Sequence, residues 1–276
     1  MDFELDGKIA VVTGASVGIG REIAKVLAAE GAQTVVVARR SNLLATLQDE
    51  IVQDGGKRPL AITADFFDPS TPEKIKDQVL KEFGHIDILI NNVGRGAAHK
   101  AGNAPGVGWT FDTPAYAKDN KAAVATDPVE AAWETAFAIN LTSTRRLTHA
   151  FLPIMQQRKW GRIINITGGA EPMAVNAVHA SKASLHAWAK GLSREMGKYG
   201  ITVNCLAPGR IHSEQMDTRI FTNKEDQEKF AQAFIPLGYF GDPCDMAYLA
   251  VFLSSPKSRY ITGQRISVDG GMAMAV

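Results

Sequence analysis

The sequence predicts an α/β protein built on a doubly wound parallel sheet of about seven strands, with helices on both faces, in a single domain of residues 1–276. Two observations lead to this prediction. Short apolar runs rich in β-branched residues alternate with longer amphipathic stretches, which is typical of parallel strands joined by crossover helices. The 276 residues are 45% hydrophobic and 21% charged, which suits one large globular domain.

The predicted strands are "KIAVVTG", "TVVVA", "LAITAD", "IDILINN", "RIINIT", "TVNCLAP" and "RISVDG". Helical periodicity between them predicts helices at Ile19–Ala29, Leu43–Gln53, Glu73–Phe83, Val129–Gln157, Ser181–Tyr199 and Asp245–Leu253. Residues 95–127 are rich in Gly, Ala and Pro and have no sustained period, which predicts an insertion loop at the carboxyl edge of the sheet. We expect this insertion to form a lid over an active site, and the irregular stretch 210–222 to lie on the same edge.

Charge and cysteine content exclude several classes of partner. Thirty basic and 29 acidic residues leave a formal charge of +1, so no nucleic-acid or anionic-membrane partner is expected. The two cysteines, Cys205 and Cys244, have neither metal-ligand spacing nor disulfide density, which favours a reducing compartment and no metal. The sequence has no cleavable apolar leader and no run of about 18 apolar residues, so we expect a cytoplasmic protein.

A glycine-rich turn follows the first predicted strand. The segment "TGASVGIG", Thr13 to Gly20, leads directly into a helix. Such a turn lets the backbone approach a pyrophosphate, whose charge is met by the free N–H groups and the positive dipole end of the helix. Because strand, turn and helix occur together, the sequence predicts a Rossmann-type dinucleotide site.

Three further segments fit that site, each with a simpler alternative. The second strand ends in "ARR", and Arg39 and Arg40 would suit a ribose 2′-phosphate, which favours NADP(H) with NAD(H) as an alternative; they could also be two solvated arginines. Asp65, in "TAD", is expected near an adenine edge or in an ordinary turn. Asn92 and Gly94, in "NNVG", are either cofactor contacts or turn formers.

Together these segments resemble the short-chain dehydrogenase/reductase family over nearly the whole chain. "TGASVGIG" is similar to its TGxxxGxG turn, "NNVG" to its NNAG, "INL" to its active-site Asn segment, "LAPGRIHS" to its PG turn and "ITGQRISVDGG" to its C-terminal strand. The resemblance implies an NADP(H)-like cofactor and a homodimer or homotetramer formed through the two long helices. It implies cofactor contacts from Gly14, Ser16, Val17, Ile19, Arg39, Arg40, Asp65, Asn92, Gly94, Lys182, Pro208, Ile211 and Ser213.

The catalytic set that the resemblance implies is incomplete. In the family a serine and a tyrosine hold and protonate a carbonyl oxygen, a lysine lowers the tyrosine pKa, and an asparagine anchors a water relay. Asn140 and Lys182 match two of these positions. The tyrosine position, four residues before Lys182, is Val178, and the serine position is Gly168, with Thr167 one residue earlier. The alignment therefore predicts an atypical active site.

Five residues are candidates to replace the missing groups. No tyrosine lies between Tyr116 and Val178, which occupies the tyrosine position of the family. Tyr116 itself could reach the site from the insertion or pack within the loop. His179 titrates near neutral pH but, one position along a helix, could face a neighbouring helix instead. Thr167 could donate to a substrate or cap a strand, and Glu171 could be a general base or a solvated acid. His212 follows the PG turn near the expected nicotinamide.

Two functions fit these observations. The first is an NADP(H)-dependent oxidoreductase with a remodelled, Tyr-less site acting on a small carbonyl, enone or imine-like substrate, with catalytic roles for Lys182, Asn140, Thr167 and His179. The second is a protein of the same fold that binds NADP(H) without redox chemistry, as a lyase, a hydratase or a binding or regulatory protein. We favour the oxidoreductase because the cofactor motif is the best-preserved feature.

Overall fold

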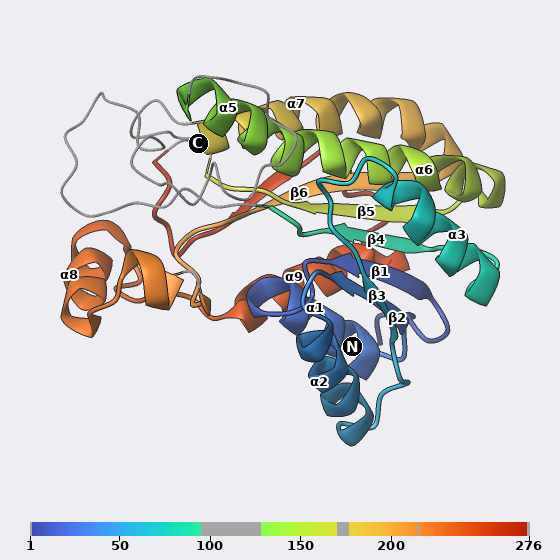
Figure 1. Cartoon of the computed structure of the whole chain (residues 1–276), viewed down its shortest axis with the longest axis horizontal. Helices are drawn as coiled ribbons and strands as arrows, with labels where there is room; N and C mark the ends of the chain where they lie inside the picture. The colour runs from blue at the N-terminus through green and yellow to red at the C-terminus, as the bar shows by residue number, and fades with distance from the viewer. Residues whose placement is uncertain (1, 95–127, 170–176, 215, 275–276) are drawn as a thin grey trace.

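The computed structural model describes residues 2–94, 128–169, 177–214 and 216–274, and these form one α/β sheet structure (Figure 1). Its seven strands lie in the order β3-β2-β1-β4-β5-β6-β7, and every neighbouring pair is parallel. The prediction of a doubly wound parallel sheet is confirmed. The strands are β1 (Ile9–Thr13), β2 (Gln33–Ala38), β3 (Leu60–Thr63), β4 (Ile88–Asn91), β5 (Gly161–Ile166), β6 (Ile201–Pro208) and β7 (Arg265–Val268).

Helices cover both faces of the sheet. In Figure 1, α1, α2 and α9 lie below the sheet and α3, α6 and α7 above it, while α8 is set apart from both layers. The described helices are α1 (Gly18–Ala29), α2 (Ser41–Gln53), α3 (Thr71–Phe83), α5 (Pro128–Phe137), α6 (Ser143–Arg158), α7 (Ala177–Met196), α8 (Lys224–Phe234) and α9 (Pro243–Ser254). Short turns of other helix types are η1 (Ala138–Thr142), η2 (Gly197–Tyr199), η3 (Met216–Ile220) and η4 (Pro256–Ser258).

The alternating side chains of the strands build two separate cores. In β1, Ala10 and Val12 pack with the buried faces of α1, α2 and α9. Ile9 and Val11 point to the other face and pack with α3, α6 and α7. Because both faces of these strands are buried, they are continuous apolar runs, as expected for a parallel sheet.

The strand order places the topological switch point at the carboxyl ends of β1 and β4. The connections run outward in opposite directions from these two neighbours, and in open α/β sheets ligands bind at such a switch point. The glycine-rich turn follows β1, and the loops after β5 and β6 begin at the same edge. The predicted insertion, residues 95–127, lies outside the described residues.

The predicted helix Val129–Gln157 is interrupted. The structure divides it into α5, the π-helical turn η1 and α6. At the junction the Ser143 hydroxyl donates a 2.6 Å hydrogen bond to the carbonyl of Ile139, a local bond that bends helices. Helix α7 also begins at Ala177, earlier than the predicted Ser181, and α8 was not predicted.

At the opposite edge, Asp87 fixes the start of the sheet. Its side chain is buried and accepts a 2.9 Å hydrogen bond from the backbone N–H of Ile9, with His85 Nε2 at 3.2 Å. Asp87→Ala leaves that buried N–H without its acceptor, so we expect it to lower the free energy of unfolding by about 2–3 kcal/mol, measured by urea denaturation. The exposed Asp77→Ala should stay within about 0.5 kcal/mol of wild type. Equal effects of the two substitutions would contradict this assignment.

Candidate functional site

The glycine-rich turn packs so closely against the end of β4 that side chains do not fit at two positions. Gly14 has a φ of +66°, and a Cβ there would lie 2.8 Å from Asn92 Nδ2. A Cβ on Gly20 would lie 2.3 Å from the same nitrogen and 2.5 Å from the Gly14 carbonyl oxygen. Glycine is therefore required by this close approach.

Asn92 ties the ends of β1 and β4 together. Its Nδ2 donates to the carbonyls of Thr13 and Gly14, both at 3.1 Å. The Thr13 hydroxyl oxygen in turn accepts from the backbone N–H groups of Asn92 and Val93, at 2.9 and 3.1 Å. The Asn92 amide thus holds the turn that the sequence predicts to bind a pyrophosphate.

The N-terminus of α1 is open for an anion. Val17 precedes the helix and contributes no side-chain cap, and the first turn contains no acidic residue in this described part of the chain. The dipole and free N–H groups at this end are therefore not neutralised by the helix itself. Arg21, which sequence reasoning missed, donates to the carbonyl of Ser16 at 3.1 Å and fixes the turn. Ser213 Cβ lies 3.5 Å from the place of a Cβ on Gly18, so the loop after β6 reaches the turn.

The predicted ribose-binding residues lie at the ends of β2 and β3. Arg39 and Arg40 are both exposed after β2. Arg40 pairs with Glu214 at 2.9 Å, although the two residues are 174 positions apart, and this partner was not predicted. Asp65 is also exposed, and its carboxylate accepts from the backbone N–H of Phe67 at 3.1 Å, as in an ordinary turn.

Lys182 is in α7, and its ammonium reaches the carboxyl end of β5. Its Nζ donates a 2.7 Å hydrogen bond to the carbonyl of Thr167, and a Cβ on Gly168 would lie 3.1 Å from Lys182 Cδ. The residue as a whole is partly exposed, yet its ammonium is surrounded by protein. Burial lowers the pKa of Lys182 from 10.5 to about 8, which corresponds to roughly 3 kcal/mol against the charged form.

The hydroxyl of Thr167 is engaged within the protein. Thr167 is fully buried, and its hydroxyl donates to the carbonyl of Leu206 at 3.1 Å. His186 Nε2 lies 2.7 Å from the same hydroxyl oxygen. Burial, with smaller contributions from Arg265 and Lys182, lowers the pKa of His186 to about 4. The spacing of four residues between Lys182 and His186 on α7 could have indicated this shared face.

Asn140 and Val178 lie where α7 meets η1 and α5. Asn140 Nδ2 donates to the Ser181 hydroxyl at 3.1 Å, and that hydroxyl donates to the carbonyl of Val178 at 2.9 Å. The Val178 side chain is 2% exposed and packs with Ala136 and Trp133. An apolar contact between helices thus occupies the position four residues before Lys182.

The remaining candidates are spread over three regions. The pKa of His179 is lowered by burial, then by Lys182 and Arg210, so its ring lies near both cations. His212 Nδ1 lies 3.0 Å from Asp217 Oδ1 in the loop after β6. Glu171 and Tyr116 lie outside the described residues. Pro208 ends β6 and Ile211 is buried just after it.

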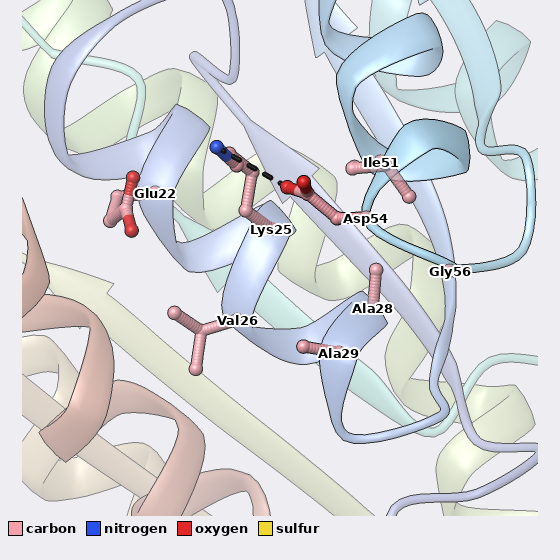
Figure 2. Close-up of a pocket in the computed structure, with 8 residues that line it drawn as sticks. All are labelled: Glu22, Lys25, Val26, Ala28, Ala29, Ile51, Asp54 and Gly56. Atoms are coloured by element: carbon pink, nitrogen blue, oxygen red, sulfur yellow. Dashed lines mark ion pairs between the residues drawn. The ribbon is translucent and has the colours of Figure 1, made fainter.

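A separate hollow of about 250 Å³ lies between α1 and α2 (Figure 2). The middle and C-terminal half of α1 line it, and Lys25 and Asp54 form an ion pair of 3.6 Å at its rim. None of the predicted site residues lines this hollow. Across the described chain, no cluster of three or more His, Cys, Asp or Glu residues could hold a metal ion, and no helix there is long and apolar enough to cross a membrane.

Comparison with known proteins defines the family. A family model described as enoyl-(acyl carrier protein) reductase matches residues 14–273. The 3-oxoacyl-(acyl-carrier-protein) reductase FabG of Escherichia coli (strain K12) is 35% identical over 277 residues, which cover 99% of this chain and 100% of that protein. The chain belongs to the short-chain dehydrogenase/reductase family, a family of NAD(P)-dependent oxidoreductases.

Solved structures agree with this assignment. A 7α-hydroxysteroid dehydrogenase complexed with NADH and 7-oxo glycochenodeoxycholic acid is 30% identical with a TM-score of 0.82, covering 99% of this chain and 97% of that one. The L-sorbose reductase of Gluconobacter frateurii, complexed with NADPH and L-sorbose, is 28% identical with a TM-score of 0.84 and full coverage of both chains, 100% each. These complexes agree with the predicted nicotinamide dinucleotide cofactor.

The low pKa of His186 predicts an acid-sensitive fold. The native state keeps His186 neutral down to about pH 4, whereas the unfolded chain takes up the proton near its ordinary pKa of 6.5. Its contribution to stability is therefore fully present above about pH 6.5 and is lost as the pH falls towards 4. We expect His186→Gln to reduce the shift of the urea midpoint between pH 7 and pH 4.5. The same shift in both proteins would contradict this role.

Proposed function

We propose that this chain is an NADP(H)-dependent oxidoreductase with a Tyr-less active site, in which the Lys182 ammonium donates the proton. The substrate class is a small carbonyl, enone or imine-like compound. The observation that carries the proposal is the enclosed ammonium at the end of β5, which is 2.7 Å from the Thr167 carbonyl and has a pKa of about 8. A general acid works best with a pKa near the working pH.

The cofactor site fits a nicotinamide dinucleotide. The close packing at Gly14 and Gly20 admits no side chain in the turn that a pyrophosphate would approach, and the uncapped start of α1 would meet its charge. Arg39 and Arg40 would face a 2′-phosphate, which supports NADP(H) over NAD(H). The remaining proposed contacts are Ser16, Val17, Ile19, Asp65, Asn92, Gly94, Lys182, Pro208, Ile211 and Ser213. A bound NADPH would supply a hydride to the reacting carbon.

Two residues near Lys182, Val178 and Gly168, support its assignment as the acid. Val178 has no ionisable group and packs against α5, so it offers no proton at the usual position. Gly168 leaves room for the Lys182 stem, because a Cβ there would lie 3.1 Å from Lys182 Cδ. With both family residues replaced, Lys182 is free of its supporting role.

The proposed proton transfer uses the residues at the end of β5. The carbonyl of Thr167 holds Lys182 Nζ in place, and Thr167 is itself fixed by Leu206 and His186, so we propose a positioning role for Thr167. As the substrate is reduced, an N–H bond of Lys182 breaks and an O–H or N–H bond forms on the substrate. The neutral amine then regains its proton from solvent. Asn140 positions α7 through Ser181, and the role of His179 stays a prediction.

We also propose that the protein is cytoplasmic and acts as a homodimer or homotetramer, as its family membership suggests. The insertion 95–127 is proposed as the lid of the same site.

Replacing the proton donor should abolish turnover. At saturating NADPH, we expect Lys182→Arg to lower kcat by about 10²–10⁴-fold, because arginine keeps the charge but cannot release a proton near neutral pH. In wild type, kcat/KM for reduction should fall above about pH 8, where Lys182 loses its proton. The assay is NADPH oxidation with a ketone, an enone and an imine.

Lys190→Arg, an exposed change on the same helix, is the matched control and should leave kcat unchanged. If Lys182→Arg keeps kcat within threefold of wild type, Lys182 is not the acid. If wild type binds NADPH but oxidises none with any of the three substrates, the redox function itself is wrong and the non-redox alternative replaces it.

The nucleotide preference should depend on Arg40. We expect Arg40→Gln to raise the Kd for NADPH about tenfold and to leave the Kd for NADH unchanged, because it removes a charged donor to the 2′-phosphate. Glu214→Gln, which frees Arg40 from its ion pair, should leave NADPH binding equal or tighter. Both constants are measured by fluorescence titration. A parallel loss of NADH and NADPH affinity in Arg40→Gln would contradict this role.

A further inference from the structure

Arg210 brings a second, partly buried cation to the edge of the sheet that holds the candidate site. It follows the turn after β6, where its carbonyl accepts from the backbone N–H of Gly241 at 2.9 Å. Its guanidinium Cζ lies 5.0 Å from the ring centre of Phe230 and 6.0 Å from that of Phe221. The backbone is thus fixed, and two aromatic rings hold the side chain.

The guanidinium lacks a counter-charge in the described structure. Arg210 Nε is buried and makes no hydrogen bond to a described residue, and none of the ion pairs found there involves Arg210. Burial lowers the pKa of Arg210. Aromatic faces attract a cation, but they offer no acceptor for its N–H groups, so a large part of the cost of burial is uncompensated.

The surroundings of Arg210 are basic. Lys182 Nζ donates to the carbonyl of Thr167, and the backbone N–H of Thr167 donates a 2.8 Å hydrogen bond to the carbonyl of Leu206 in β6, four residues before Arg210. Lys182 and Arg210 thus come from the ends of neighbouring strands, and both lower the pKa of His179. The two acids of the same loop are already engaged: Asp217 lies 3.0 Å from His212 Nδ1 and accepts from the backbone N–H of Ser213, and Glu214 pairs with Arg40. An anion entering this region would meet two cations and no competing free carboxylate among the described groups.

We propose that Arg210 binds a carboxylate group of the substrate, so that the oxidoreductase acts on oxo acids. This inference rests on the proposed function for the identity of the reacting group. A guanidinium is planar and presents paired N–H donors that match a carboxylate, and a desolvated guanidinium binds it more strongly than an exposed one. In this arrangement Arg210 binds the carboxylate of the substrate, and Lys182 donates the proton to its carbonyl oxygen.

The experiment measures binding without turnover. Acetoacetate, pyruvate and phenylpyruvate, each paired with its methyl ester, are titrated calorimetrically into protein saturated with NADP⁺. We expect wild type to bind at least one acid about tenfold more tightly than its ester, a difference expected for one charge-assisted contact. Arg210→Gln should abolish this preference, and Arg210→Lys, which keeps the charge but loses the paired donors, should retain a part of it. Arg194→Gln, an exposed change on α7, should keep it fully.

The other outcomes overturn the proposal. These are equal binding of acids and esters by wild type, no binding of either, or a preference that survives in Arg210→Gln. A tenfold loss of NADP⁺ affinity in Arg210→Gln would assign the guanidinium to the cofactor phosphates instead. The thermal midpoint of each variant tests whether it is folded. If Arg210→Gln is not folded, the acid preference of Arg210→Lys tests the proposal. This binding experiment consumes no NADPH, so it tests the carboxylate site separately from turnover. If wild type binds an acid in preference to its ester but oxidises no NADPH, the proposed redox function is wrong and the carboxylate site at Arg210 stands.

Discussion

The hydrogen bond between Lys182 Nζ and the Thr167 carbonyl determines how the candidate site is arranged. It joins helix α7 to the end of β5 and keeps an ammonium inside the protein. The stem of the lysine passes close to residue 168: a Cβ there would lie 3.1 Å from Lys182 Cδ, so the stem would have to move by a few tenths of an ångström. One charge-assisted bond of about 1.5–3 kcal/mol offsets only a part of the cost of enclosing this charge, and the remainder appears as the lowered pKa of Lys182.

The same edge of the sheet holds the cofactor turn through a different device. Asn92 bridges β1 and β4 with its side-chain amide, which donates to the carbonyls of Thr13 and Gly14 in the turn. A larger residue at Gly20 would displace this amide before it could touch a cofactor. Sheet topology determines at which edge ligands bind. The hydrogen bonds of Lys182 with Thr167 and of Asn92 with Thr13 and Gly14 determine which protein atoms line that edge.

The sheet and the glycine turn were predictable because their signals are local. Each strand is a short β-branched run, and the turn follows the first of them directly. The break at Asn140 was not predictable, since the periodicity of residues 129–157 continues across it. The π turn there is stabilised by contacts from outside the segment, such as the bond from Asn140 to Ser181 on α7. Such turns commonly mark functional sites, but tertiary contacts produce them.

Arg210 was missed for a related reason. A single arginine after a turn has no periodicity, and only the fold brings it near Lys182 and His179. A carboxylate bound at Arg210 would change the pKa of Lys182, the proposed proton donor. In the free enzyme, burial favours the neutral form of Lys182. A carboxylate bound at Arg210 would bring a negative charge to the same edge of the sheet and favour the ammonium. The proposed substrate would therefore raise the pKa of the group that protonates it, so that the proton is retained until the substrate is present.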